Sequence, residues 1–163
     1  MSTNGPVVPG LRELAAGIRT AEHAITTETA HLLRSLDLTV RQYSTMVILA
    51  ESPDLSGAHL ARLCLVTPQS MAAILAKLAD RELIERTPSS VHERVLLARL
   101  SPKGWAALRK AETLTESAGA RLTNTLRPAE RSQLRDYLQR VIDAFTRGDD
   151  RDPAPRVEDH NAV

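Results

Sequence analysis

Four consecutive residues carry side chains that suit the recognition of DNA bases. A predicted helix starts with Thr67, Pro68, Gln69 and Ser70. Threonine is a favoured N-cap residue, and proline fits the first helical position. The Gln69 amide can form two hydrogen bonds with adenine in the major groove, and the Ala73 methyl group can contact the methyl group of thymine. Thr67, Ser70 and the free amide groups at the helix start can bind phosphate. The alternative is that Gln69 is an ordinary solvated residue.

Two short helices joined by a tight turn have to position these side chains. The first is predicted to begin after Ser56, and only Leu65 and Val66 separate it from the second. The expected buried positions are Ala58, Leu60, Ala61 and Cys64 in the first helix and Met71, Ile74, Leu75 and Leu78 in the second. Such a helix-turn-helix can enter a major groove. We therefore expect Ser56, His59 and Arg62 to lie beside the DNA backbone and Lys77 to contact a phosphate.

A β-hairpin is predicted directly after the second helix. Two β-rich runs, 83–86 and 95–100, flank the turn-rich segment 87–90, and Leu96, Ala98 and Leu100 share one face. A hairpin in this position is a wing. Arg94 is expected to enter a minor groove or to contact its phosphates, with a plain surface charge as the alternative. His92 is expected to stabilise the wing.

Two helices are predicted before this region. The apolar positions of the first have coiled-coil spacing, interrupted at Glu28, so it needs a partner helix. These positions are Leu11, Leu14, Ile18, Ala21, Ile25 and Leu32. Thr39 and Gln42 form a capping box that starts the second helix, which ends at Ser52-Pro53. Its expected buried stripe consists of Tyr43, Met46, Val47 and Ala50.

Two further helices are predicted after the hairpin. Ser101-Pro102 starts a long helix that reaches about Asn124. Its apolar positions are Trp105, Leu108, Ala111, Leu114, Ala118 and Leu122. Pro128 starts the last helix, in which Leu134, Tyr137, Leu138, Val141, Ile142 and Phe145 form a regular apolar stripe.

Composition narrows the function classes. The 163 residues are 42% hydrophobic and 25% charged, as in a soluble globular protein. Aromatic residues make up only 2%, which disfavours single-stranded nucleic acid binding by base stacking. No apolar run approaches the length of a membrane span, and no signal peptide is evident. With a single cysteine in the chain, these features predict a cytoplasmic protein.

The charge of the chain is unevenly distributed. The net charge is only +1, but residues 56–103 carry a net +3 and residues 148–163 a net −3. Duplex affinity comes largely from phosphate neutralisation, so a local positive segment is sufficient in a dimer that doubles it. The alternative is that this excess is an ordinary solvated surface.

Four stretches in this order resemble the multiple-antibiotic-resistance regulator (MarR) family of winged-helix transcription factors. They are Leu38-Thr39-Val40-Arg41-Gln42-Tyr43, Leu60-Ala61-Arg62 with Val66-Thr67-Pro68-Gln69-Ser70-Met71, Leu78-Ala79-Asp80-Arg81-Glu82-Leu83-Ile84-Glu85-Arg86, and Leu100-Ser101-Pro102-Lys103-Gly104. The resemblance covers nearly all of residues 10–147. The chain differs from many members at the wing, where His92-Glu93-Arg94 replaces Asp-Arg-Arg, and in the turn, where Leu65 replaces a small residue.

The resemblance implies a homodimer that binds a palindromic site on double-stranded DNA and, in many members, releases it on binding a small phenolic or aromatic ligand. The first and last helices would form the dimer interface, with Leu11, Leu14, Ile18, Leu134, Leu138, Val141, Ile142 and Phe145 as candidates. An effector pocket would lie where the first, second and long helices meet. Its candidate residues are His23, Thr26, Thr27, Met46, Val47 and Trp105, for which simple core packing is the alternative.

Other chemistry is not indicated. Cys64 invites a redox interpretation, but a buried small hydrophobe is the favoured one. A family branch senses zinc, yet His23, Glu28 and His31 fit solvated or interface positions better, so neither a metal nor a cofactor is predicted. No catalytic motif is evident, and an enzyme is not expected.

The sequence therefore predicts a mainly α fold with a small β-hairpin wing, in five segments. Residues 1–9 and 148–163 are flexible tails, the second acidic, and 10–36 with 125–147 form a helical dimerisation region. Residues 37–103 form a winged helix-turn-helix, and 104–124 a long linking helix. The expected function is a DNA-binding regulator, more specifically a ligand-released homodimeric repressor. The alternative is a dimeric winged-helix adaptor that binds protein.

Overall fold

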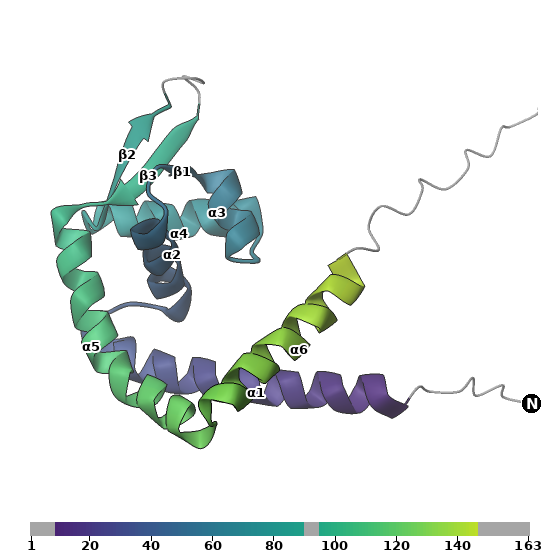
Figure 1. Cartoon of the computed structure of the whole chain (residues 1–163). Coiled ribbons are helices and arrows are strands. Elements are labelled where there is room, and N and C mark those ends of the chain that lie inside the picture. The colour runs from purple at the N-terminus through teal and green to yellow at the C-terminus, as the bar shows by residue number, and fades with distance from the viewer. Residues whose placement is uncertain (1–8, 90–94, 147–163) are drawn as a thin grey trace, which may run out of the picture. The chain divides into compact units, whose positions relative to one another are not determined.

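The computed structural model describes residues 9–89 and 95–146 (Figure 1). Its helices are α1 (Pro9–Leu33), the 3-10 turn η1 (Arg34–Leu36), α2 (Val40–Glu51), α3 (Gly57–Leu63), α4 (Pro68–Asp80), α5 (Pro102–Thr125) and α6 (Pro128–Thr146). Its strands are β1 (Leu55–Ser56), β2 (Ile84–Pro88) and β3 (Leu96–Leu100). The chain divides after Gly119 into two compact units. The predicted tails were 1–9 and 148–163; apart from Pro9, which begins α1, they lie outside the described residues.

The helix starts of the first unit follow their local signals. The capping box of α2 is present, because the Thr39 side chain accepts from the Gln42 amide and the Gln42 side chain accepts from the Thr39 amide. At α5 the Ser101 hydroxyl accepts from the Gly104 amide at 2.9 Å. These bonds satisfy amide groups that have no partner within the helix.

A three-stranded antiparallel sheet has the order β1-β3-β2. In the hairpin, Ile84 pairs with Leu100 and Arg86 with Ala98. The short strand β1 pairs its Leu55 with Ala98 on the other side of β3. The hairpin was predicted correctly, although β2 extends through Pro88 rather than ending before a turn at 87. The strand β1 was missed, because two residues carry no periodic pattern.

The core of the first unit lies between α2, α3, α4 and the sheet, which Figure 1 shows clustered together. Met46, Leu60, Met71 and Leu78 are all fully buried, at 0% exposure. The ends of the long helices join this core through Leu33 of α1 and through Leu108 and Ala111 of α5. Burying such aliphatic side chains is the main stabilising contribution to folding.

Two positions expected to be apolar and buried are instead exposed. Ala58 of α3 is on the surface, and Trp105 of α5 is 41% exposed. Helical spacing indicates which residues share a face, but Ala58 and Trp105 lie beyond the part of that face that the core covers.

The described part of the second unit contains the end of α5 and the helix α6. Pro128 occupies the first turn of α6, and the Glu130 carboxylate accepts from the Arg127 amide at 2.8 Å. The hydrogen bond from the Arg127 side chain lowers the pKa of Glu130. The predicted apolar stripe of α6 is present and exposed in the single chain. None of the described helices combines the length and apolar character needed to cross a bilayer.

Candidate nucleic-acid interface

The turn between α3 and α4 is tight and unusual. Leu65 has a backbone φ of 52°, in the left-handed region, and its side chain is 92% exposed. Hydrogen bonds from the Leu65 amide to the Arg62 carbonyl and from the Val66 amide to the Ala61 carbonyl close the turn. Glycine adopts this conformation without steric cost, whereas a leucine does not. Leu65, which stands where many family members have a small residue, therefore adds local backbone strain but does not change the geometry of the turn.

The predicted cap at the start of α4 is present and complete. The Thr67 hydroxyl accepts from the Ser70 amide at 3.1 Å and donates to the Ser70 hydroxyl oxygen at 2.9 Å. The Ser70 proton therefore stays available for an outside acceptor. Because Pro68 has no N–H and the Ser70 amide is capped, Gln69 carries the one open amide of the first three positions. Several free amide groups were expected to bind phosphate, but among these three positions only the Gln69 amide is open to do so.

The two faces of α4 differ in the way required for groove insertion. Met71, Leu75 and Leu78 are buried, whereas Gln69, Ala73 and Lys77 are exposed. The Lys77 ammonium group makes no ion pair among the residues that the structure describes. A helix with a small and polar outer face can approach base edges without steric conflict.

Two of the three predicted backbone contacts lie on the exposed surface of α3, and the third, Ser56, is half-buried at its start. Ser56 is the N-cap residue of α3, and its hydroxyl accepts from the His59 amide at 3.2 Å. His59 and Arg62 are exposed. Ser56 thus has a structural task that the sequence interpretation did not assign to it.

The base of the wing is held by a contact that was not predicted. The Arg99 guanidinium of β3 donates to the Asp54 carboxylate at 2.8 Å, which ties the hairpin to the loop before β1. The predicted wing residues His92 and Arg94 lie outside the described residues, so their roles stay predictions.

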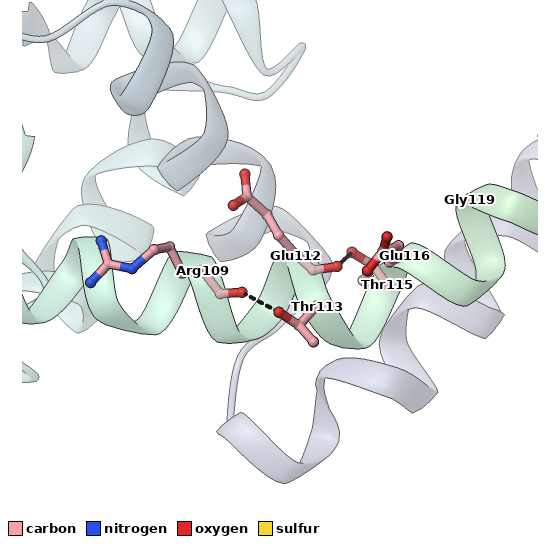
Figure 2. Close-up of a pocket in the computed structure, with 6 residues that line it drawn as sticks. All are labelled: Arg109, Glu112, Thr113, Thr115, Glu116 and Gly119. Carbon is pink, nitrogen blue, oxygen red and sulfur yellow. Dashed lines mark hydrogen bonds between the residues drawn. The ribbon is translucent and has the colours of Figure 1, made fainter.

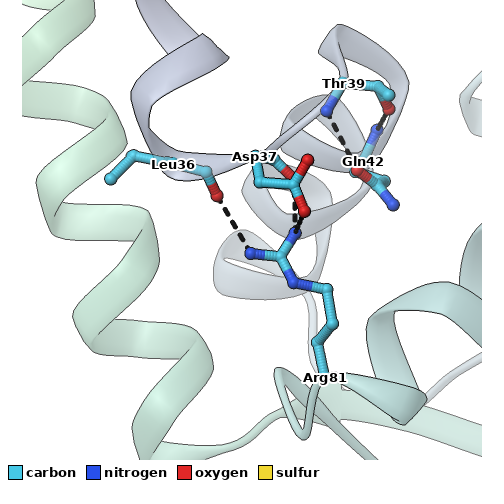
Figure 3. Close-up of polar contacts among 5 residues, drawn as sticks. All are labelled: Leu36, Asp37, Thr39, Gln42 and Arg81. Atoms are coloured by element: carbon cyan, nitrogen blue, oxygen red, sulfur yellow. Dashed lines mark hydrogen bonds and ion pairs between the residues drawn. The ribbon is translucent and has the colours of Figure 1, made fainter.

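A second group of contacts missed by sequence reasoning lies at the C-terminal end of α4, where Arg81 is the cap residue (Figure 3). The Arg81 guanidinium donates to the backbone carbonyls of Leu36 and Asp37. Figure 3 shows this fork meeting the segment between α1 and α2, beside the Thr39–Gln42 capping box. A cavity of about 300 Å³ adjoins it, lined by Asp37, Thr39, Gln42, Lys77, Asp80 and Arg81. No local signal predicts the Arg81 contacts, because the bonded residues are 44 and 45 positions apart.

The segment after Arg81 is also tied to α5. The Ser101 hydroxyl donates to the Glu82 carbonyl at 2.6 Å, and the Ser101 amide donates to the Leu83 carbonyl. The Lys103 ammonium lies 2.8 Å from the Glu82 carboxylate, and this hydrogen bond lowers the pKa of Glu82. A side chain at Gly104 would place its Cβ 1.9 Å from the Leu83 carbonyl oxygen, so only glycine fits.

The residues predicted for an effector pocket line neither the cavity beside Arg81 nor a larger cavity beside α5. Met46 is fully buried in the core and Trp105 is 41% exposed, while His23 and Thr27 are exposed on α1. Val47 and Thr26 are half-buried, and the Thr26 hydroxyl donates to the Glu22 carboxylate. A larger cavity, of about 630 Å³, adjoins α5 and is lined by Arg109, Glu112, Thr113, Thr115, Glu116 and Gly119 (Figure 2).

Cys64 caps the end of α3 and is half-buried, with its sulfur 3.6 Å from the Thr45 hydroxyl oxygen. The half-buried Cys64 therefore fits the expected role of a small packing residue better than that of an exposed redox-active thiol. Within residues 9–89 and 95–146, no group of three or more histidine, cysteine, aspartate or glutamate side chains is arranged to hold a metal ion.

A helix-turn-helix followed by an antiparallel hairpin, with a polar and small outer face on its second helix, defines the winged-helix class. The fold class predicted from the sequence is confirmed, since solved winged-helix structures match most of the chain. The sequence profile of the MarR family matches residues 36–95. The transcriptional repressor Rv2887 of Mycobacterium tuberculosis is 33% identical over 114 residues, which cover 70% of this chain and 82% of that protein. The chain belongs to the MarR family.

Two solved structures illustrate the likeness. The repressor CouR, bound to a 23-mer DNA duplex, has a TM-score of 0.74 and 25% identity over 85% of this chain and 99% of its own. Mycobacterium tuberculosis Rv2887 in complex with p-aminosalicylic acid has a TM-score of 0.59 and 29% identity over 84% of this chain and 98% of its own.

Proposed function

We propose that this chain is a homodimeric transcriptional repressor that binds a palindromic operator on double-stranded DNA and releases it when a small ligand binds. The observation that carries the proposal is the outer face of α4. Gln69, Ala73 and Lys77 are exposed on this face, and the helix that carries them is capped at its start by Thr67. The DNA-bound relative CouR has the same fold.

Base recognition is assigned to the start of α4. Gln69 pairs with an adenine, and Ala73 contacts a thymine methyl group. Thr67, Pro68 and Ser70 place this turn at the edge of the groove, with the free Ser70 proton directed to a phosphate or base oxygen. Ser56, His59 and Arg62 of α3 lie along the backbone, Lys77 neutralises a phosphate, and Arg94 with His92 carries the wing contact.

Dimerisation is assigned to the apolar stripes of α1 and α6. Leu11, Leu14 and Ile18 of α1 are at least 40% exposed, and Leu134, Leu138, Val141, Ile142 and Phe145 of α6 are at least 37% exposed. Exposed apolar stripes at helical spacing are typical of protein interfaces. A second copy of the chain covers them, and the symmetry of the dimer matches that of a palindromic operator.

The ligand is assigned to the class of small aromatic carboxylates, because the relative Rv2887 binds p-aminosalicylic acid and salicylic acid. His23, Thr26, Thr27, Met46, Val47 and Trp105 are the candidate contacts. A ligand of this kind releases DNA only if it binds more tightly to a conformation in which the two α4 helices do not match the half-sites. The protein acts in the cytoplasm, without a cofactor and without catalysis.

Selection of duplexes from a random library, followed by fluorescence anisotropy at two salt concentrations, tests the proposal. The wild-type protein should enrich a two-fold symmetric site whose affinity falls steeply with salt. Gln69→Ala should weaken that site by about 1–3 kcal/mol and relax the preference at one base pair per half-site. The matched control Gln139→Ala, on α6, should leave both unchanged.

Two further probes separate the assigned roles. Replacing the thymine opposite Ala73 with uracil removes only the methyl group and should weaken wild-type binding but not that of Ala73→Gly. Arg94→Ala should weaken specific and nonspecific duplexes alike. Enrichment of no sequence, with weak salt dependence, would instead support a protein partner.

A further inference from the structure

The end of the recognition helix α4 is connected to both long helices of the first unit, and the two connections are built differently. Toward α5 the links are the backbone hydrogen bond from Ser101 to Leu83, the bond from the buried Ser101 hydroxyl to Glu82 and the exposed Glu82–Lys103 pair, beside the close approach of Gly104 to Leu83. Toward α1 the link is one side chain, that of Arg81. The first connection includes backbone hydrogen bonding and tight backbone packing, whereas the hydrogen bonds of the second all come from one guanidinium group.

The Arg81 side chain meets the segment where α1 gives way to the winged helix. The turn η1 ends at Leu36, and Asp37 follows with a left-handed φ of 52°. Carbonyl groups at the end of a helical turn lack donors within the helix and carry a partial negative charge. Arg81 supplies both donors from one planar fork, at 2.9 Å to the Leu36 oxygen, and its side chain is only 34% exposed. The Asp37 carboxylate, 3.9 Å away and almost fully exposed, adds little.

Apolar packing and backbone hydrogen bonds also hold this joint. Leu33 and Leu38 are buried in the core on either side of it, and Leu36 packs against that core. The Asp37 amide donates to the Arg34 carbonyl at 3.1 Å, and the Leu38 amide donates to the Leu33 carbonyl at 3.4 Å. Among the residues that the structure describes, no other side chain donates to the backbone of residues 34–37. Arg81 therefore adds to the apolar packing the side-chain hydrogen bonds that join the end of α4 to this segment.

We propose that Arg81 is a positioning residue for operator binding, which fixes α4 against the end of α1 and thereby sets the half-site spacing that the dimer accepts. This inference rests on the proposed function, because it requires a dimer held by α1 and two half-sites. A dimer that reads half-sites one helical turn apart presents its two recognition helices at about 34 Å. If the joint is stiff on each protomer, a duplex with any other half-site spacing binds more weakly. If the joint is loose, part of that lost affinity is recovered.

The test compares two duplexes: the operator selected by the wild-type protein from a random library, and the same operator with one base pair inserted between its half-sites. The measured quantity is the dissociation constant for the duplex with the insertion divided by that for the selected operator. Arg81→Gln should reduce this ratio by roughly tenfold, since each protomer loses two charge-assisted hydrogen bonds. Arg81→Lys should give an intermediate ratio, because an ammonium group keeps the charge but not the planar fork.

The matched control is Arg34→Gln. Arg34 is exposed in η1 itself, so this variant loses the same charge at the same joint without losing the fork. Its ratio should equal that of the wild type. A merely structural role for Arg81 would lower the active fraction and weaken both duplexes equally, leaving the ratio unchanged.

The outcomes are distinct. Folded Arg81→Gln and Arg81→Lys proteins with the wild-type ratio would overturn the proposal, and so would failure of both variants to fold, which would make Arg81 a folding residue. If the wild-type protein selects no two-fold site, the proposed function fails before any variant is measured.

Discussion

The recognition helix α4 and the last helix α6 have the same kind of apolar spacing but opposite environments. In α4 the residues Met71, Leu75 and Leu78 are at most 1% exposed, whereas in α6 Leu138 is 39% and Phe145 67% exposed. The helix α4 packs against α2, α3 and the sheet of its own unit. An apolar stripe thus identifies the face that will be covered, but not whether the cover comes from the same chain.

This difference separates two kinds of stability. The core around α4 is stabilised by contacts within one chain, so its stability does not depend on protein concentration. In the proposed dimer, the stripes of α1 and α6 gain burial free energy only when a second copy covers them, so the stability of these two helices should rise with protein concentration. The substitutions below test that contrast in order of decreasing free-energy change.

Replacing Leu138 with Asp should dissociate the dimer and leave the winged helix folded. Each interface contains the residue twice, so losing the burial of two leucines weakens dimerisation by about 3–6 kcal/mol. Sedimentation over a range of concentrations measures the change. Ser132→Asp, an exposed position on the same helix, is the control and should stay dimeric. A Leu138→Asp protein with an unchanged dimer dissociation constant would show that α6 does not form the interface.

Replacing Leu75 with Ala should destabilise the winged helix itself. Leu75 is 1% exposed, and removing a buried leucine side chain leaves a cavity that costs about 2–5 kcal/mol. Urea unfolding of the wild type and the variant measures this. The same change at Leu63, which is 48% exposed, should cost no more than about 0.5 kcal/mol. Equal costs at the two positions would contradict the burial pattern.

Replacing Leu65 with Gly should stabilise the protein by about 0.5–1 kcal/mol. Relief of left-handed strain at this residue is partly offset by the greater backbone freedom of glycine in the unfolded chain. Leu63→Gly, in regular helix, should have the opposite sign. Thermal unfolding of both variants gives the comparison, and a loss of stability in Leu65→Gly would mean that its exposed side chain makes a stabilising contact.

The ion pair between Glu82 and Lys103 should have the smallest effect, because both side chains are exposed. The hydrogen bond from Lys103 lowers the pKa of Glu82 below its ordinary value of 4.5. A lowered folded-state pKa contributes stability above that ordinary value, and the contribution disappears as the pH falls through the folded-state pKa. Urea unfolding should therefore distinguish wild type from Glu82→Gln at neutral pH but not in acid. A difference that persists in acid would have another cause.

Most of the helical framework was predictable from local sequence. The caps at Thr39, Thr67 and Ser101 were recognisable because each bonds an amide only three residues away. The outer face of α4 could likewise be assigned, since a helix places side chains by spacing alone. The candidate effector contacts were less accessible to this reasoning, because a pocket depends on how elements from distant parts of the chain pack.

Local sequence signals were enough to locate the starts of α2, α4, α5 and α6, the apolar face of each helix and the hairpin after α4. The folded molecule was needed to show that Leu55 and Ser56 add a third strand to the sheet, that Leu65 turns left-handed, and that Arg81 bonds to the carbonyls of Leu36 and Asp37. The difference is one of range along the chain. Caps and periodicity act over a few residues, whereas strand pairing, backbone strain and the Arg81 contacts arise when packing brings distant segments together.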